Sequence, residues 1–423
     1  MSVEEQPFRR EYTAQRLLKV VGQNTPRAEL EMVTRALNLA QDVHQELVNN
    51  QPTPHFQTSA LEQAIAVATI LAQARVDANG VSAGLVYEAV DTGLLTLERV
   101  RDTLGDTVAT VVEKEISLRA VENKRRKIIL EQSPTETDTK KSSTKKRTFR
   151  TFGRRQAELT QKMYSSVAED PRTILLRLAY QLHRMRLIAS GAHSLNNQQM
   201  LILVRETREI FGPMAREQEM VGLADEMEDL AFKILELDKY RWVRTQIEAE
   251  NKRRHAYTEE VQATLRELFE KFALKAEVFG HAEHVYGLYK KICQAINADE
   301  DEPLERLQSA SIDFNQIEVL LIFSIFVETL EDCYQALEVV HELWQPKTEQ
   351  IKDFIANPKP NGYQALHTTV SYLANLAVEM RIRTYEMQNT ADPDSGAEHW
   401  RYKKIYLLTP KGMLLTSLWE PRH

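Results

Sequence analysis

A strongly basic stretch between positions 124 and 155 is the first feature of this chain that could bind a charged ligand. Its lysine and arginine side chains stand against only Glu131, Glu136 and Asp138. The sequence between them is rich in Ser and Thr and cannot bury a core, which predicts a disordered insertion over about 123–155. Two interpretations stay open. The stretch is a solvated loop, or it contacts RNA, another polyanion or a protein. Its affinity for a polyanion would depend on the salt concentration.

A second concentration of polar side chains runs from Lys352 to Arg383. Asn-Pro and Pro-Asn-Gly turn signals lie inside it, at 357–358 and 360–362. Residues 377–383 then alternate as a strand does. One predicted face of this strand is apolar, and the other carries Glu379, Arg381 and Arg383.

Composition limits the class of protein. A length of 423 residues allows two to three domains, and the net charge of -7 argues against general binding to nucleic acid or an anionic membrane. Cys293 and Cys333 are far apart and fit neither a disulfide framework nor a zinc site, which predicts a reducing compartment. No run approaches the roughly 18 apolar residues of a membrane span, and the charged N-terminus lacks a signal-peptide layout. We therefore predict a cytoplasmic protein without membrane contact.

The elements that must position these side chains form an all-helical half followed by an α+β half. Helices are predicted within 26–121, over 156–188 and 198–211, and around 223–237, with Thr258 as the N-cap of the next one. Strands are predicted over 275–279, 320–327, 365–373 and 377–383, the second of them central and buried on both faces. One buried helical stripe is expected from residues at three- and four-residue steps: Leu97, Val100, Leu104, Val108, Val111 and Val112.

Several motifs, in their order and spacing, resemble one family. The longest is KDFIANPKPNGYQALHTT, an eighteen-residue run over 352–369, which is far more specific than a lone short motif. The shorter ones are EDLAF at 228–232, KAEV at 275–278, DCY at 332–334, EMRIRT at 379–384 and HWRYK at 399–403. Together they resemble the long RelA/SpoT-homologue family of (p)ppGpp synthetase/hydrolases over roughly residues 30–412.

The resemblance implies a mostly α N-terminal half with an HD-type helical domain, and an α+β nucleotidyltransferase-like synthetase domain with a mixed β-sheet. The implied boundaries are 26–195 for a degenerate hydrolase-like domain, 196–255 for a helical connector, 256–403 for the synthetase domain and 404–423 for the remnant of a TGS domain. The family uses regions beyond this point for activation on the ribosome, so that activation is not expected of this chain.

The resemblance also implies that hydrolase chemistry is lost. The family holds a divalent metal through two His and two Asp, beside an acidic pair. The acidic pair is here Asp91-Thr92, and a nearby His183 is expected to be a packed or surface histidine. A single carboxylate cannot replace a four-ligand set, so no metal site is expected. The residues at the ligand positions are Gln63, Tyr87, Glu88 and Tyr180.

In the synthetase half, the resemblance implies loss of the side that binds the donor nucleotide. The family transfers pyrophosphate from ATP to the 3′-hydroxyl of GDP or GTP, with magnesium held by carboxylates. The position of one magnesium-binding Asp is Val319, and the arginines that stack on adenine match His281 and Ser324, which lack the guanidinium plane. A family Lys matches Glu283, which would repel the triphosphate.

The guanine side is implied to remain. Tyr363 matches the aromatic ring that stacks on guanine, a contact of about 1–3 kcal/mol. Glu379 matches the family's second acidic residue, and Arg381 stands where Gln is usual, which favours a more phosphorylated guanine nucleotide. The residues kept for phosphate and ribose are Lys352, Lys359, Asn361, Gln364 and His367.

Three functions stay open at this point. The first is a pseudoenzyme that binds GDP, GTP or (p)ppGpp. The second is an active GTP pyrophosphokinase with an unusual donor site, the only case in which Mg²⁺ is an expected cofactor. The third is an interaction scaffold that contacts RNA or a protein through the basic stretch, in which the 352–369 run persists only because it folds the domain.

Overall fold

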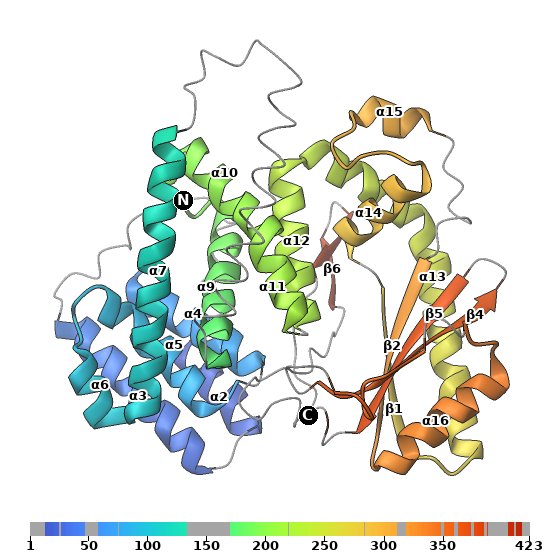
Figure 1. Cartoon of the computed structure of the whole chain (residues 1–423), viewed down its shortest axis with the longest axis horizontal. Coiled ribbons are helices and arrows are strands. Elements are labelled where there is room, and N and C mark those ends of the chain that lie inside the picture. The colour runs from blue at the N-terminus through green and yellow to red at the C-terminus, as the bar shows by residue number, and fades with distance from the viewer. Residues whose placement is uncertain are drawn as a thin grey trace. The chain divides into compact units, whose positions relative to one another are not determined.

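The computed structural model divides the chain into two units, the first ending at Leu235 and the second beginning at Glu236 (Figure 1). The residues it describes are 13–24, 27–46, 58–74, 76–132, 170–218, 220–282, 284–310, 319–347, 351–358, 363–373, 376–384, 387, 405–409 and 412–416.

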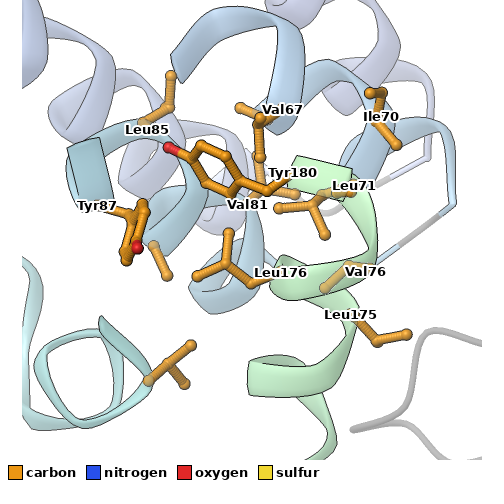
Figure 2. Packing of buried hydrophobic residues seen from close by; sticks show 14 of the residues in the cluster. Val67, Ile70, Leu71, Val76, Val81, Leu85, Tyr87, Leu175, Leu176 and Tyr180 are labelled. Carbon is orange, nitrogen blue, oxygen red and sulfur yellow. The ribbon is translucent and has the colours of Figure 1, made fainter. Parts of the chain in front are cut away.

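The elements of the first unit are all helical, as predicted, although the first helix begins at Ala14, before the predicted start at residue 26. Its helices pack around one apolar core, in which Val67 and Leu71 lie close to Leu85 and Leu176 (Figure 2). The elements are α2 (Ala14–Asn24), α3 (Arg27–Glu46), α4 (Ala60–Gln73), α5 (Ala78–Asp91), α6 (Leu97–Leu104), α7 (Asp106–Gln132), α9 (Pro171–Ala189), α10 (Asn197–Glu206), a π-helical turn η3 (Thr207–Phe211), α11 (Gly212–Glu217) and α12 (Val221–Leu235).

The predicted stripe over 97–112 is buried, but it lies on two helices. Val100 and Leu104 of α6 and Val108 of α7 are all 5% exposed or less. Gly105 separates the two helices with φ +99° and ψ 168°, a backbone conformation open in practice only to glycine. The periodicity therefore predicted the buried face correctly and missed the turn inside it.

The prediction of a disordered basic insertion is wrong for its first part. Helix α7 continues through Lys124 and Lys127 and ends at Gln132. The remainder of the stretch, with its predicted RNA or protein contact, lies outside the described residues. Among the described helices, none is long and apolar enough to span a membrane.

The second unit contains a five-stranded mixed sheet. The strand order is β1-β2-β5-β4-β3; β2 and β5 are parallel and the other pairs are antiparallel. A separate antiparallel hairpin is formed by β6 (Ile405–Thr409) and β7 (Gly412–Thr416). The remaining elements are α13 (Leu237–Lys271), β1 (Ala276–Ala282), α14 (Val285–Ala295), α15 (Leu304–Ser309), β2 (Val319–Val327), α16 (Leu330–Leu343), β3 (Lys352–Asp353), β4 (Leu366–Leu373) and β5 (Leu376–Thr384).

The two faces of this sheet differ. Helices α13 and α16 pack on one face, against apolar residues such as Phe323 of β2 and Met380 of β5. Because side chains alternate along a strand, Ser324, Glu379 and Arg381 point to the opposite face. The prediction that 320–327 is buried on both faces is therefore only partly right, since Ser324 is half-buried.

The predicted helix start at Thr258 is wrong. Helix α13 runs unbroken from Leu237 to Lys271, so Thr258 lies inside it. A Cβ placed on Gly280 of β1 would lie 2.6 Å from the Thr258 methyl group, which means that the helix packs closely on the strand at this point. Thr258 serves this helix-on-sheet contact in the interior of α13.

Candidate functional site

The first candidate site is the set of predicted metal-ligand positions in the helical unit. Gln63 lies on α4, Tyr87 and Glu88 on α5, and Tyr180 on α9, and all four are at most 4% exposed. The rings of Tyr87 and Tyr180 pack edge to face with their centroids 4.8 Å apart. Figure 2 shows both rings in the apolar core between α5 and α9.

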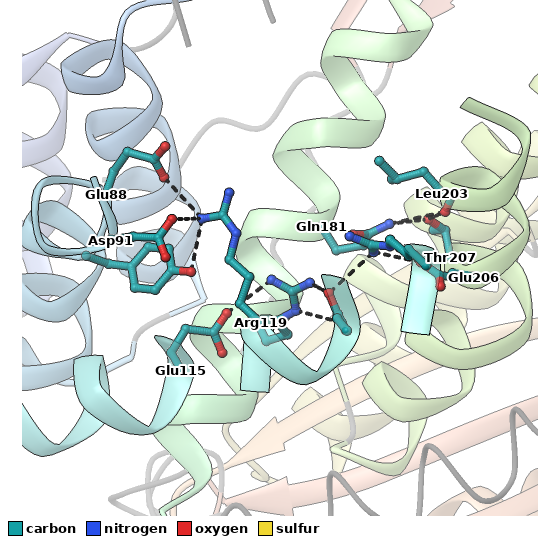
Figure 3. Close-up of polar contacts among 12 residues, drawn as sticks. Glu88, Asp91, Glu115, Arg119, Gln181, Leu203, Glu206 and Thr207 are labelled. Atoms are coloured by element: carbon teal, nitrogen blue, oxygen red, sulfur yellow. Dashed lines mark hydrogen bonds and ion pairs between the residues drawn. The ribbon is translucent and has the colours of Figure 1, made fainter. Parts of the chain in front are cut away.

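Arg119 of α7 enters this site. Its Nη1 atom lies 2.9 Å from Asp91 Oδ2 and 3.6 Å from Glu88 Oε2, and it donates a hydrogen bond of 3.0 Å to the Tyr87 hydroxyl (Figure 3). Burial raises the pKa of Glu88, and the positive charge of Arg119 opposes that rise. Burial likewise raises the pKa of Tyr87 above its ordinary value, so the phenol stays neutral.

These residues do not fit a divalent metal ion. An amide and two neutral phenols replace the imidazole and carboxylate ligands such an ion takes, and a permanent guanidinium charge is bound to the carboxylates that remain. Among the residues that the structure describes, no group of three or more His, Cys, Asp or Glu side chains could hold a metal. The loss of the metal set stays a prediction from the sequence.

A buried ion network on the neighbouring helices was not predicted. Arg177 of α9 is 1% exposed, pairs with Glu115 at 3.2 Å and donates to Glu122 at 3.0 Å. Arg126 of α7 bonds Glu206 of α10 at 2.7 Å through Nε. One signal was present: Arg177 interrupts the apolar run from Ile174 to Leu178, where an arginine must find a partner.

Burial also sets the protonation of two groups in this unit. It raises the pKa of Glu115 to about 7, with Arg177 opposing the rise. It lowers the pKa of His183 to about 3, and the charges of Arg186 and Arg184 lower it further. His183 is 1% exposed and is thus a packed histidine, one of the two interpretations of this residue.

The second candidate site lies on the face of the sheet opposite α13 and α16. Tyr363 shares a hydrogen bond of 2.8 Å between its hydroxyl and Nε2 of His367. His367 Nδ1 lies 3.6 Å from Oε1 of Glu379, and Arg381 Nε donates to the same oxygen at 2.8 Å. Four of the predicted site residues thus form one connected chain across β4, β5 and the segment before β4.

Tyr363 is more enclosed than a free stacking platform. Its side chain is 2% exposed. The Phe354 ring meets it edge to face at 6.1 Å, and the Arg383 guanidinium lies 5.7 Å from its centroid. Phe354 and Arg383 were not predicted site residues, although the alternation of β5 put Arg383 on the right face.

The other predicted residues are less closely connected. Lys352 is exposed on β3 and pairs in register with His367, and Gln364 donates to the Ile355 carbonyl at 3.3 Å. Ser324 lies opposite Arg381 in the register of β2 and β5. Val319 begins β2, and His281 lies near the end of β1, but only their backbones are described. Lys359, Asn361 and Glu283 lie outside the described residues.

The fold and the two sites define a two-part protein with an HD-type helical half and a nucleotidyltransferase-like half. Residues 36–221 match the HD domain family, and residues 281–406 match the family described as a region found in RelA/SpoT proteins. The chain belongs to the RelA/SpoT-homologue family.

Curated relatives align with most of the chain. It is 30% identical to the GTP pyrophosphokinase of Myxococcus xanthus, over 91% of this chain and 44% of that protein. It is 29% identical to a probable guanosine-3′,5′-bis(diphosphate) 3′-pyrophosphohydrolase of Synechocystis sp., over 90% and 44%. It is 25% identical to the bifunctional (p)ppGpp synthase/hydrolase SpoT of Escherichia coli, over 93% and 49%. The chain spans less than half the length of each of these relatives.

Proposed function

We propose that this protein acts in (p)ppGpp metabolism and the stringent response as a pseudoenzyme. It binds GDP, GTP or (p)ppGpp on the polar face of the sheet, and neither hydrolyses (p)ppGpp nor uses ATP. The observation that carries the proposal is a connected series of polar contacts: Tyr363 and His367 share a hydrogen bond, Arg381 donates one to Glu379, and His367 lies 3.6 Å from Glu379. These contacts join four residues of the predicted guanine side. The predicted metal ligands of the helical unit are replaced, and so is one of the two acidic positions expected to hold magnesium in the synthetase unit.

The charge of the sheet face suits an anionic nucleotide. Among these four contacting residues, Glu379 alone is acidic, and it already accepts a hydrogen bond from Arg381. Lys352 is exposed beside His367, and Arg383 lies two residues beyond Arg381 on the same strand face. With Glu379 neutralised within the protein, cationic donors outnumber acidic groups, and such donors bind phosphate oxygens through charge-assisted hydrogen bonds.

Tyr363 adds a constraint on how a base would bind. Since its ring is 2% exposed, a guanine can stack on it only after the ring is uncovered. Such stacking contributes roughly 1–3 kcal/mol, and part of it would then offset the free-energy cost of uncovering the ring. We therefore expect modest affinity, with recognition that depends on the phosphates as well as on the base.

The same geometry argues against pyrophosphate transfer. Transfer needs a magnesium ion whose charge balances that of the moving phosphoryl group. Val319 supplies no ligand, and the Glu379 carboxylate is bound to Arg381, so these residues do not fit a carboxylate-held magnesium ion. Ser324, opposite Arg381, has no planar group for adenine.

The test is calorimetric titration of the full chain with GDP, GTP, ppGpp and ATP, each with and without magnesium. We expect saturable binding of at least one guanine nucleotide and none of ATP. Binding of ATP at comparable affinity, or binding of no guanine nucleotide, would contradict the proposal.

An active GTP pyrophosphokinase is the second candidate. Two observations favour it: the retained Glu379, and 30% identity over 91% of the chain to a GTP pyrophosphokinase. It requires magnesium-dependent formation of ppGpp or pppGpp from labelled ATP and GDP or GTP. Product from the wild-type protein that disappears in Glu379→Gln would establish this candidate and displace the pseudoenzyme.

A further inference from the structure

We propose that Arg119 takes the place of a divalent metal ion as the structural cation of the helical unit. The carboxylates of α5 that remain near the predicted metal site are then held by a side chain of α7. This inference concerns the first unit alone and does not depend on nucleotide binding by the second.

The contacts of Arg119 span two helices. From α7 it reaches Tyr87, Glu88 and Asp91, which occupy adjoining positions on the last turn of α5. Its side chain is 16% exposed, against 5% for Glu88 and 26% for Asp91. One partly enclosed cation thus bridges two carboxylates and a phenol, as a metal ion with ligands from several helices would.

A guanidinium and a divalent metal ion bind carboxylates differently. A guanidinium carries one permanent charge and five N–H donors, so it can bind several oxygens at once without deprotonating any of them. It needs no free ion and cannot be removed by a chelator. Asp91 and Glu88 are therefore neutralised from within the chain.

Other charged or titratable groups also face Glu88. Arg184 of α9 also opposes the rise in the pKa of Glu88 that burial causes, whereas Asp91 adds to that rise. Tyr180 faces Glu88 from α9 as a neutral phenol, its pKa raised well above the ordinary value by burial. Arg119 lies within ion-pair distance of both carboxylates.

The experiment compares thermal unfolding midpoints of full-length variants in EDTA and in millimolar MnCl₂. We expect the wild-type midpoint to be the same in both. Arg119→Met leaves the buried Glu88 and the more exposed Asp91 without their cation and should lower the midpoint by about 5 °C or more. Adding Glu88→Gln and Asp91→Asn to Arg119→Met removes those charges and should recover at least half of the loss.

Arg186→Met is the matched control. Arg186 has 14% exposure and pairs in two-pronged fashion with a single, more exposed carboxylate, Glu226. Its loss should lower the midpoint less, and adding Glu226→Gln should recover little. Should Arg119→Met fail to fold, Arg119→Lys, which keeps a cation, and the neutral triple variant still supply the comparison. A wild-type midpoint that falls in EDTA, or a triple variant no more stable than Arg119→Met, would overturn the proposal.

Discussion

Arg381 donates a hydrogen bond of 2.8 Å from Nε to Oε1 of Glu379, two positions earlier on the same face of β5. In the helical unit, Arg119 stands in a similar relation to Asp91, at 2.9 Å. In each unit, an acidic residue at or beside a predicted metal position is thus bound by an arginine of the same chain.

The first prediction concerns Arg381. Arg381→Gln removes a cation from the sheet face and leaves His367, at 3.6 Å, as the remaining described partner of the Glu379 carboxylate. A hydrogen bond to a charged group contributes about 1.5 kcal/mol or more, so we expect the Kd for ppGpp to rise roughly tenfold. The loss should be smaller for GDP, which carries fewer phosphates. Calorimetric titration of both nucleotides measures the difference.

Arg306→Gln is the control for this variant. Arg306 pairs with Glu302 at 2.7 Å across one turn at α15, and its side chain is 62% exposed. Removing it changes the net charge by the same amount without touching the sheet face. Equal weakening of ppGpp binding in both variants would assign the effect to net charge rather than to Arg381.

The second prediction separates the ring of Tyr363 from its hydroxyl. Tyr363→Phe keeps the aromatic surface and loses only the hydrogen bond to His367, so guanine-nucleotide affinity should change by no more than about fivefold. Tyr363→Ala removes the ring, and the loss of about 1–3 kcal/mol should weaken binding by roughly 5- to 150-fold. Fluorescence titration with a labelled guanine nucleotide reports both. Similar affinities for the Phe and Ala variants would exclude stacking on this ring.

The third prediction is a pH dependence with opposing contributions. Glu115 has a folded-state pKa raised to about 7, so the native state holds a proton that the unfolded state releases, and stability falls as pH rises from about 4.5 towards 7. His183 has a folded-state pKa lowered to about 3, so the unfolded state binds the extra proton, and stability falls as pH drops below about 6.5. The two slopes offset one another between pH values of about 4.5 and 6.5.

Removing Glu115 should make the contribution of His183 to the pH dependence of stability easier to measure. Glu115→Gln removes the contribution of Glu115 that opposes that of His183, so the unfolding midpoint should fall more steeply on acidification from pH of about 6.5 to 4.5 than it does in the wild type. The carboxamide keeps the size of Glu115 and can still accept a hydrogen bond from Arg177. Parallel midpoint-versus-pH curves for wild type and variant would show that Glu115 is ionised throughout this range in the folded protein.

The sequence predicted local features better than tertiary ones. The alternation over 377–383 correctly placed Glu379 and Arg381 on one strand face, because a period of two depends only on the backbone. The predicted helix start at Thr258 is wrong because a threonine can either cap a helix or pack inside a long one, and its local sequence does not distinguish the two. Which of the two occurs depends on β1 and its Gly280.

The candidate sites show the same limit. The missing metal ligands were visible residue by residue, but Arg119 was not, since nothing local to α7 indicates that it reaches α5. The partners of Arg177 lie 55 and 62 positions away, at Glu122 and Glu115, and only the packing of α7 on α9 brings them together. The burial of Tyr363 likewise depends on Phe354 and Arg383, which come from separate segments.

The last prediction concerns the turn at Gly105, which sequence periodicity missed. Its φ of +99° and ψ of 168° belong to a region that side chains disfavour, while a Cβ there would meet no atom within 4 Å. The cost of Gly105→Ala is therefore backbone strain alone, about 1–3 kcal/mol. Gly22→Ala in α2 is the matched control: its Cβ would make an ordinary contact of 3.5 Å with Leu30, and helix propensity should raise stability by about 0.5–1 kcal/mol. Denaturant unfolding of the two variants should shift the midpoints in opposite directions. A Gly105→Ala variant as stable as the wild type would mean that α6 and α7 can join as one helix along their shared buried stripe.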